Sequence, residues 1–141
     1  MGTGTPKMFS NNKDISDRVV TTDPKAVNVE IDRIFLELYP EANTRALDIA
    51  FGDADRIYRG ELPGFHACDT AYHDIQHVLD VTLAMARLID GYERSRVGTD
   101  PMGKNLFQLG IITALFHDVG YIRTSEDKNA KNGAEFTLVH V

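Results

Sequence analysis

Apolar side chains recur at helical spacing along most of the chain, in stretches separated by polar segments that contain glycine and proline. The first stretch follows Asp23, a residue type that caps helices, and begins with Pro24, which is favoured in a first helical turn. Later stretches place apolar residues three or four positions apart, which is typical of a helix with one buried face. The pattern predicts helices over residues 24–39, 44–59, 72–92 and 105–118, and a fifth that begins near Asn132 and continues to Val141.

The fourth of these stretches is apolar on most sides, so we expect it to be the central helix. No stretch reads convincingly as a strand, which makes an all-α fold the prediction. We therefore expect a flexible leader over residues 1–22 and one helical bundle of about five helices over residues 23–141. The last residues, GAEFTLVHV, have no capping residue or polar tail after them. We expect the bundle to be incomplete at this end, and to be covered by a neighbouring chain or continued in a longer protein.

The composition suits a single globular domain, because 43% of the 141 residues are apolar and 26% are charged. The formal net charge of −6 argues against nucleic acid or an anionic membrane as the main partner, but not against a small phosphorylated substrate. Cys68 is the single cysteine, which excludes a disulfide or a cysteine-based zinc site within one chain. Since no stretch approaches the roughly 20 apolar residues of a membrane span and no secretory signal is present, we expect a cytoplasmic protein.

Two pairs of polar residues interrupt the apolar pattern with metal-ligand chemistry. His73 and His77 are four residues apart, so a helix would place them on one face. His117 and Asp118 are consecutive and point about 100° apart on a helix, so they can reach one ion only where the helix ends. Gly120 is expected to provide that ending. The spacing therefore predicts two helices that meet at a site suited to zinc, iron, manganese or cobalt rather than to magnesium alone.

Several nearby residues have two readings each. Asp74 and Asp80 can orient a histidine through its second ring nitrogen, or they can lie on a solvated helix face. His66, in a loop without a partner, is read as an ordinary histidine. Basic residues in or beside the loop after the His-Asp doublet can hold a phosphate, or they can belong to an ordinary charged loop: Arg123, Lys128 and Lys131.

The sequence YHDIQHVLDVTLAMARL, followed by ITALFHDVGY, resembles the HD-domain metal-dependent phosphohydrolases. The YHxxxH element is similar to that of cyclic-nucleotide phosphodiesterases and of small bacterial HD proteins. The resemblance covers residues 70–141 and implies an HD-type helical bundle. Its paired motifs are specific for the superfamily and do not identify the substrate.

Carried to this chain, the resemblance implies that His77, His117 and Asp118 are metal ligands and that Asp118 is the bridge if a second metal binds. It implies that His73 donates a proton to the leaving oxygen. One or two divalent ions are implied, with iron, manganese, zinc or cobalt at the first site and magnesium as an option at the second.

The resemblance also implies a supporting side chain for the second metal on the segment NGAEFTLVH, where Glu135 and His140 are the candidates. The family's last ligand is an aspartate on a later helix, and the sequence ends before such a residue. The activity of this chain alone therefore depends on whether the remaining ligands suffice.

The function expected from these observations is hydrolysis of a phosphoester, as in a phosphodiesterase or nucleotidase, with a nucleotide as the small phosphorylated substrate. The cyclic-dinucleotide branch is not expected, because Tyr121 is followed by Ile122 where that branch has proline. One alternative is a catalytically inactive metal- or ligand-binding module that a partner or second subunit completes, as a homodimer through the open C-terminal end. Another is a helical domain in which the histidines only pack.

Overall fold

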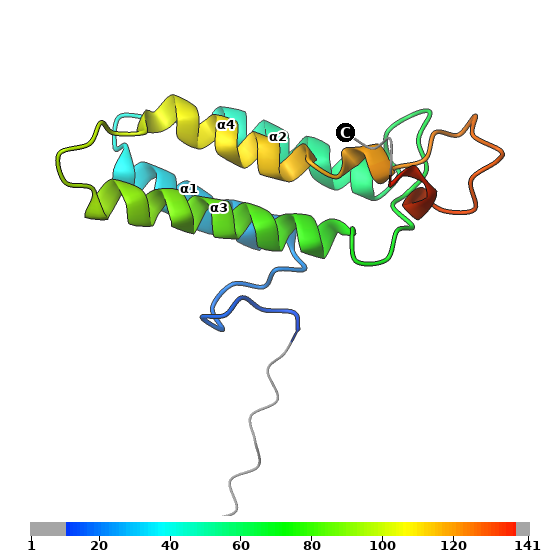
Figure 1. Ribbon diagram of the computed structural model, residues 1–141, viewed down its shortest axis with the longest axis horizontal. Coiled ribbons are helices and arrows are strands. Elements are labelled where there is room, and N and C mark those ends of the chain that lie inside the picture. Colours follow the sequence, from blue (N-terminus) through cyan, green and yellow to red (C-terminus); the bar gives the residue numbers. More distant parts are fainter. Residues whose placement is uncertain (1–10, 138–141) are drawn as a thin grey trace, which may run out of the picture.

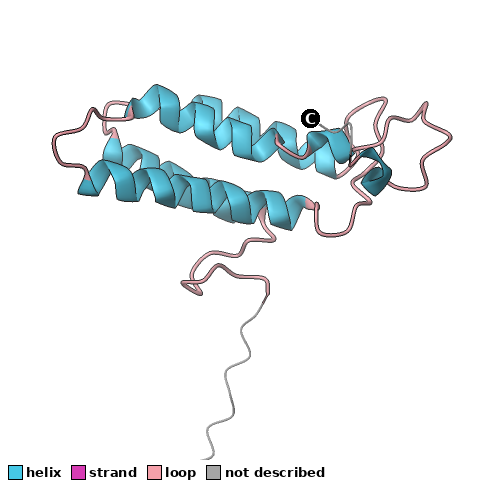
Figure 2. Cartoon of the chain, in the orientation of Figure 1, coloured by secondary structure: helices cyan, strands magenta, loops and turns pink. Residues whose placement is uncertain are grey.

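The computed structural model describes residues 11–137, which form α-helices, two short 3-10 helices and no strand (Figure 2). The all-α prediction is therefore confirmed for this part of the chain. Among these residues, no helix combines the length and the apolar character that a membrane crossing requires. The elements are α1 (Pro24–Leu38), α2 (Arg45–Tyr58), α3 (Ile75–Ser95), α4 (Gly103–Phe116), η1 (Val119–Tyr121) and η2 (Gly133–Phe136).

The four α-helices run alternately up and down as an elongated bundle (Figure 1). α1 packs against α2 and α3, and α4 packs against the same two helices. Because consecutive helices are antiparallel, the first turn of α3 lies at the same end of the bundle as the last turns of α2 and α4 (Figure 1). This topology brings the segment around residues 73–77 close to the segment around residues 117–118.

The core lies between the four helices and draws large side chains from each of them. The Phe35 ring of α1 packs against the Phe107 ring of α4, with 5.1 Å between the ring centroids. The largest fully buried apolar side chains are Ile31, Phe35, Leu47, Val27, Val78, Leu79, Leu83, Phe107, Ile111 and Leu115. They follow the helical stripes seen in the sequence, as expected for burial of one face per helix.

The expectation that the fourth helix is central is wrong for the described residues. α4 contacts α2 and α3 on one side and exposes Leu106 and Leu109 on the other, at 54% and 58% of their surface. An apolar helix surface predicts burial only if other elements surround it. In a bundle of four helices each helix occupies a corner, so one of its faces stays at the surface.

Helix ends agree with the capping signals in the sequence. The Asp23 side chain accepts a hydrogen bond from the Lys25 amide at the start of α1. α3 starts at Ile75, three residues later than predicted, because the Asp74 carboxylate accepts from the His77 amide at 3.0 Å. Of the predicted fifth helix, the structure describes only η2, and residues 138–141 lie outside the described range.

The described part of the expected flexible leader packs on the bundle. The Asp14 carboxylate accepts a hydrogen bond from the Val19 amide at 2.7 Å and forms a 2.6 Å ion pair with Arg87 of α3. Val19 and Thr21 are buried, with 7% and 1% of their surface exposed. Residues 11–22 therefore form a folded turn that contacts α3.

Two aspartates share the seam between α1 and α2, and this pair makes stability depend on pH. Burial, followed by the charge of Asp48, raises the pKa of Asp32 from 3.8 to about 7. The Asp32 Oδ1 atom is buried without a hydrogen-bond partner, whereas Asp48 accepts from Asn28 Nδ2 at 2.9 Å. Since the folded chain keeps this proton to a higher pH than the unfolded chain, the free energy of unfolding falls as pH rises from about 4 to about 7.

Asp32→Asn cannot ionise, so its free energy of unfolding should match that of the wild type near pH 4. At pH 8 it should be higher by about 1–2 kcal/mol after solvent screening of this part-exposed pair. Urea unfolding at both pH values measures the difference, with the exposed Asp100→Asn as control. If the difference in unfolding free energy between Asp32→Asn and the wild type is the same at both pH values, Asp32 does not titrate in this range.

Candidate metal centre

The His-Asp doublet lies just beyond the end of α4. The last helical residue is Phe116, and His117 follows in a helical conformation as the cap. Asp118 then leaves the helix with φ −104° and ψ 8° and is followed by η1. The predicted placement at a helix tip is thus confirmed. The role expected of Gly120 is wrong, because it lies within η1 and outside the left-handed region that a glycine helix terminator adopts.

Three imidazoles converge on a single carboxylate oxygen, Asp118 Oδ2. The distances are 2.8 Å from His73 Nδ1, 3.4 Å from His77 Nε2 and 3.2 Å from His117 Nε2. Asp118 is 3% exposed, whereas about a third of each histidine side chain is exposed. The carboxylate is therefore the buried end of the cluster, and the imidazoles lie between it and solvent.

The tautomer of His117 indicates that a proton or a metal ion lies between this histidine and Asp118. His117 Nδ1 lies 2.6 Å from the Ala114 carbonyl oxygen, which only accepts, so Nδ1 carries the proton. In a neutral imidazole, Nε2 then has only a lone pair to offer, and it faces Asp118 Oδ2 at 3.2 Å. An ionised carboxylate also only accepts. Two acceptors at this distance repel unless a proton or a metal ion lies between them.

His73 reaches the cluster by a route that helical spacing does not describe. It precedes α3, and the residue before it, Tyr72, has a positive φ of 67°, which is uncommon for a side chain of this size. This turn brings the His73 ring to 5.4 Å from the His77 ring. The prediction that both histidines share a helix face is wrong, because only His77 lies in α3, although the two side chains do come together.

The side-chain nitrogens of His73 and His77 and a carboxylate oxygen of Asp118 all lie within 4.8 Å of one another, a spacing able to hold a metal ion. His117 adjoins this group through Asp118. Three imidazoles and a carboxylate fit zinc, iron, manganese or cobalt. His73, for which the resemblance implies a proton-donor role, is thus also within reach of a ligand position.

The acidic residues beside the motifs have other roles. Asp74 caps α3, and Asp80 is exposed on the surface of the same helix. Glu135 accepts a hydrogen bond from the Lys131 amide at 2.8 Å, which stabilises the turn that leads into η2. His140, the other candidate for a second metal, lies outside the described residues.

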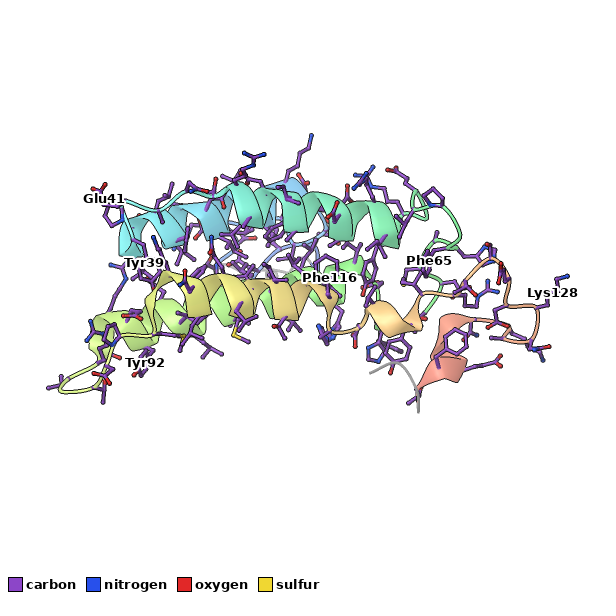
Figure 3. The ribbon with its side chains drawn as sticks, turned by 90° about the horizontal axis from the view of Figure 1, so that it is seen from above. Tyr39, Glu41, Phe65, Tyr92, Phe116 and Lys128 are labelled. Carbon is purple, nitrogen blue, oxygen red and sulfur yellow. The ribbon has the colours of Figure 1, made fainter. Side chains whose placement is uncertain are left out.

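The basic residues expected to bind phosphate lie in or beside the loop between η1 and η2. The Arg123 guanidinium donates to Asp69 Oδ2 through Nε at 2.9 Å, and a second guanidinium nitrogen lies 2.7 Å from the same oxygen. Lys128 projects from the outer tip of the loop, away from Phe116 at the end of α4 (Figure 3). Lys131 is exposed beside η2. Arg123 is therefore paired with Asp69, and Lys128 lies away from the end of α4 (Figure 3).

Two tyrosines that were not predicted as site residues lie close to the cluster. The buried Tyr121 ring stacks on His73, with 4.4 Å between the centroids and 24° between the planes. Tyr58, the last residue of α2, is 5% exposed. Burial and then the charges of Cys68 and Asp118 raise the pKa of Tyr58 above its usual range, so its phenol stays neutral. Tyr58 carries no sequence signal for the site, whereas Tyr121 belongs to the motif ITALFHDVGY that contains the doublet.

No protein-family model, curated protein or solved structure matches the chain. The geometry of the histidines and Asp118 is therefore the observation on which a functional proposal rests.

Proposed function

We propose that the protein is a metal-dependent phosphohydrolase that cleaves a phosphoester, with the cluster of His73, His77, His117 and Asp118 as its centre. The observation that carries the proposal is the convergence of three imidazole nitrogens on Asp118 Oδ2, from segments about forty residues apart. Such a set costs free energy when it is left without a cation, because Asp118 is a buried carboxylate. The resemblance of both segments to HD-domain enzymes supports the same reaction class.

In this proposal His77, His117 and Asp118 hold the metal, and the hydrogen bond from His117 to Ala114 fixes its tautomer so that Nε2 is the ligand atom. A bound divalent ion would supply Lewis acidity and a coordinated water whose pKa is lowered toward about 7. His73 is held by Asp118 through Nδ1, which leaves Nε2 as the nitrogen that donates a proton to the leaving oxygen.

One observation favours a second candidate, a metal-binding module without hydrolytic activity. Arg123 is occupied by Asp69 and Lys128 points away from the bundle, so these two cations do not supply positive charge for a phosphate beside the histidines. In this alternative a partner or a second subunit completes the site. The two candidates share the metal ligands and differ in hydrolysis.

The test is hydrolysis of p-nitrophenyl phosphate and bis-p-nitrophenyl phosphate by protein loaded separately with manganese, iron, zinc or cobalt. The wild type should hydrolyse at least one of these esters. His73→Ala should keep its metal and lose about 10²–10⁴-fold in rate, as expected for removal of a general acid. Asp80→Asn, an exposed change on α3, should keep the wild-type rate.

A wild type that binds metal and hydrolyses neither ester would contradict the hydrolase and support the inactive module. Loss of metal from His73→Ala would reassign His73 from proton donor to ligand.

A further inference from the structure

Tyr121 covers one face of the His73 imidazole. The two rings are nearly parallel, with 24° between their planes and 4.4 Å between their centroids. Tyr121 is 4% exposed, whereas the His73 side chain is 38% exposed. A half-exposed imidazole thus lies on a buried aromatic ring, and the buried ring is the less mobile of the two.

His73 depends on such support because it lies outside the regular helix. It follows the positive φ of Tyr72 and precedes the cap Asp74, so its backbone takes no part in the hydrogen-bond ladder of α3. The Cys68 thiol donates to the His73 carbonyl at 3.3 Å, and a thiol is a weak donor. The direction of the imidazole is therefore set mainly by Tyr121 at its face and by Asp118 at its edge.

Tyr121 is itself held in place from two sides. Its amide donates to the Asp118 carbonyl at 3.0 Å, which fixes it to the doublet. Its own carbonyl oxygen packs directly under Gly133 of η2, where an added Cβ would come to 1.9 Å. Only a residue without a side chain permits this approach.

The Asp69 carboxylate holds η2 against Tyr121 through hydrogen bonds. Its Oδ1 accepts from the Gly133 amide at 2.9 Å, and its Oδ2 accepts from Arg123 Nε at 2.9 Å. Arg123 in turn donates to the Ala130 carbonyl at 3.3 Å. A single carboxylate therefore ties together the loop before His73, the chain after η1 and the start of η2.

From these contacts we infer that Tyr121 is a positioning residue of the metal centre, whose stacked ring fixes the His73 imidazole so that Nδ1 faces Asp118. The pair formed by Asp69 and Arg123 acts on His73 indirectly, because it holds η2 against Tyr121. This inference rests on the proposed metal centre. Loss of the Tyr121 ring should therefore lower the rate of hydrolysis without removing the metal, since His73 is the proton donor of that centre and not one of its ligands.

The experiment compares Tyr121→Phe, which keeps the stacked ring, with Tyr121→Leu, which keeps apolar bulk without an aromatic face. The first readout is the NMR signal of the His73 ring protons in metal-free protein, assigned with His73→Ala. Stacking on Tyr121 should displace this signal upfield in the wild type and in Tyr121→Phe, and the displacement should be lost in Tyr121→Leu. The second readout is the rate at which metal-loaded protein hydrolyses bis-p-nitrophenyl phosphate, or p-nitrophenyl phosphate if the wild type cleaves only that ester, because His73 is the proton donor of the proposed centre. In Tyr121→Leu the rate should fall by up to about 10²–10⁴-fold, the range expected for His73→Ala, and in Tyr121→Phe it should stay within about 3-fold of the wild type, with the metal retained in both.

Unchanged His73 signals in a folded Tyr121→Leu would overturn the inference, and so would equal hydrolysis rates of the wild type and both variants. If the wild type binds no metal or hydrolyses neither ester, the proposed function fails, while the NMR comparison still decides whether Tyr121 stacks on His73. If Tyr121→Leu does not fold, Asp69→Asn takes its place. It should reduce the displacement of the His73 signal by loosening η2, and an unchanged signal would again count against the inference.

Discussion

Asp118→Asn is expected to remove metal binding from the purified protein. Asparagine keeps the volume and one oxygen of the side chain but loses the charge on which three imidazoles converge. Since Asp118 is 3% exposed, water cannot replace the lost carboxylate. The fall in zinc or manganese affinity should exceed the about 10–100-fold that follows loss of an outer-shell partner. Isothermal titration calorimetry of metal-stripped protein measures this affinity.

The matched control is Asp80→Asn, which makes the same chemical change at an exposed position one turn beyond His77 on α3. It should bind metal with the wild-type affinity. Equal affinities of Asp118→Asn and the wild type would show that the imidazoles bind without the carboxylate, and the centre described above would have the wrong ligand set.

Phe107→Ala is expected to lower the free energy of unfolding by about 3–5 kcal/mol, the range found for truncation of a buried aromatic side chain. Phe107 is fully buried and packs against Phe35 of α1 and Tyr39 beyond its end, with ring centroids 5.1 and 6.1 Å away. The truncation leaves a cavity between α1 and α4, which rigid helices cannot close completely. Urea unfolding followed by circular dichroism measures the loss.

Leu109→Ala on the same helix provides the comparison, because Leu109 is 58% exposed. Its effect should stay within about 0.5 kcal/mol, as is usual for surface substitutions. Similar losses for both variants would mean that the outer face of α4 is covered in solution, by a second copy or by another part of the protein.

Periodicity predicted α1, α2 and α3 because each has one clear buried stripe, and α4 was predicted from a long apolar stretch. Caps such as Asp23 marked where helices begin. The apolar pattern could not predict that α4 would leave Leu106 and Leu109 exposed, since a helix that is apolar all round carries no information on which side is covered. Periodicity could not predict that α3 starts as late as Ile75 either, because Asp74 can either cap a helix or continue one.

For the site, residue type and spacing identified His73, His77, His117 and Asp118, which the structure brings together around one oxygen. Spacing alone could not show that His73 arrives through a turn at Tyr72. The contacts of the basic loop depend on long-range pairs such as the one between Asp69 and Arg123, fifty-four residues apart. No local pattern encodes such pairs.

An anomalous-difference map of crystals grown with zinc or manganese would show whether a metal ion binds among these four residues. One strong peak per chain is expected within ligand distance of His77, His117 and Asp118. A peak elsewhere, or none in crystals of protein that was given excess metal, would contradict this expectation.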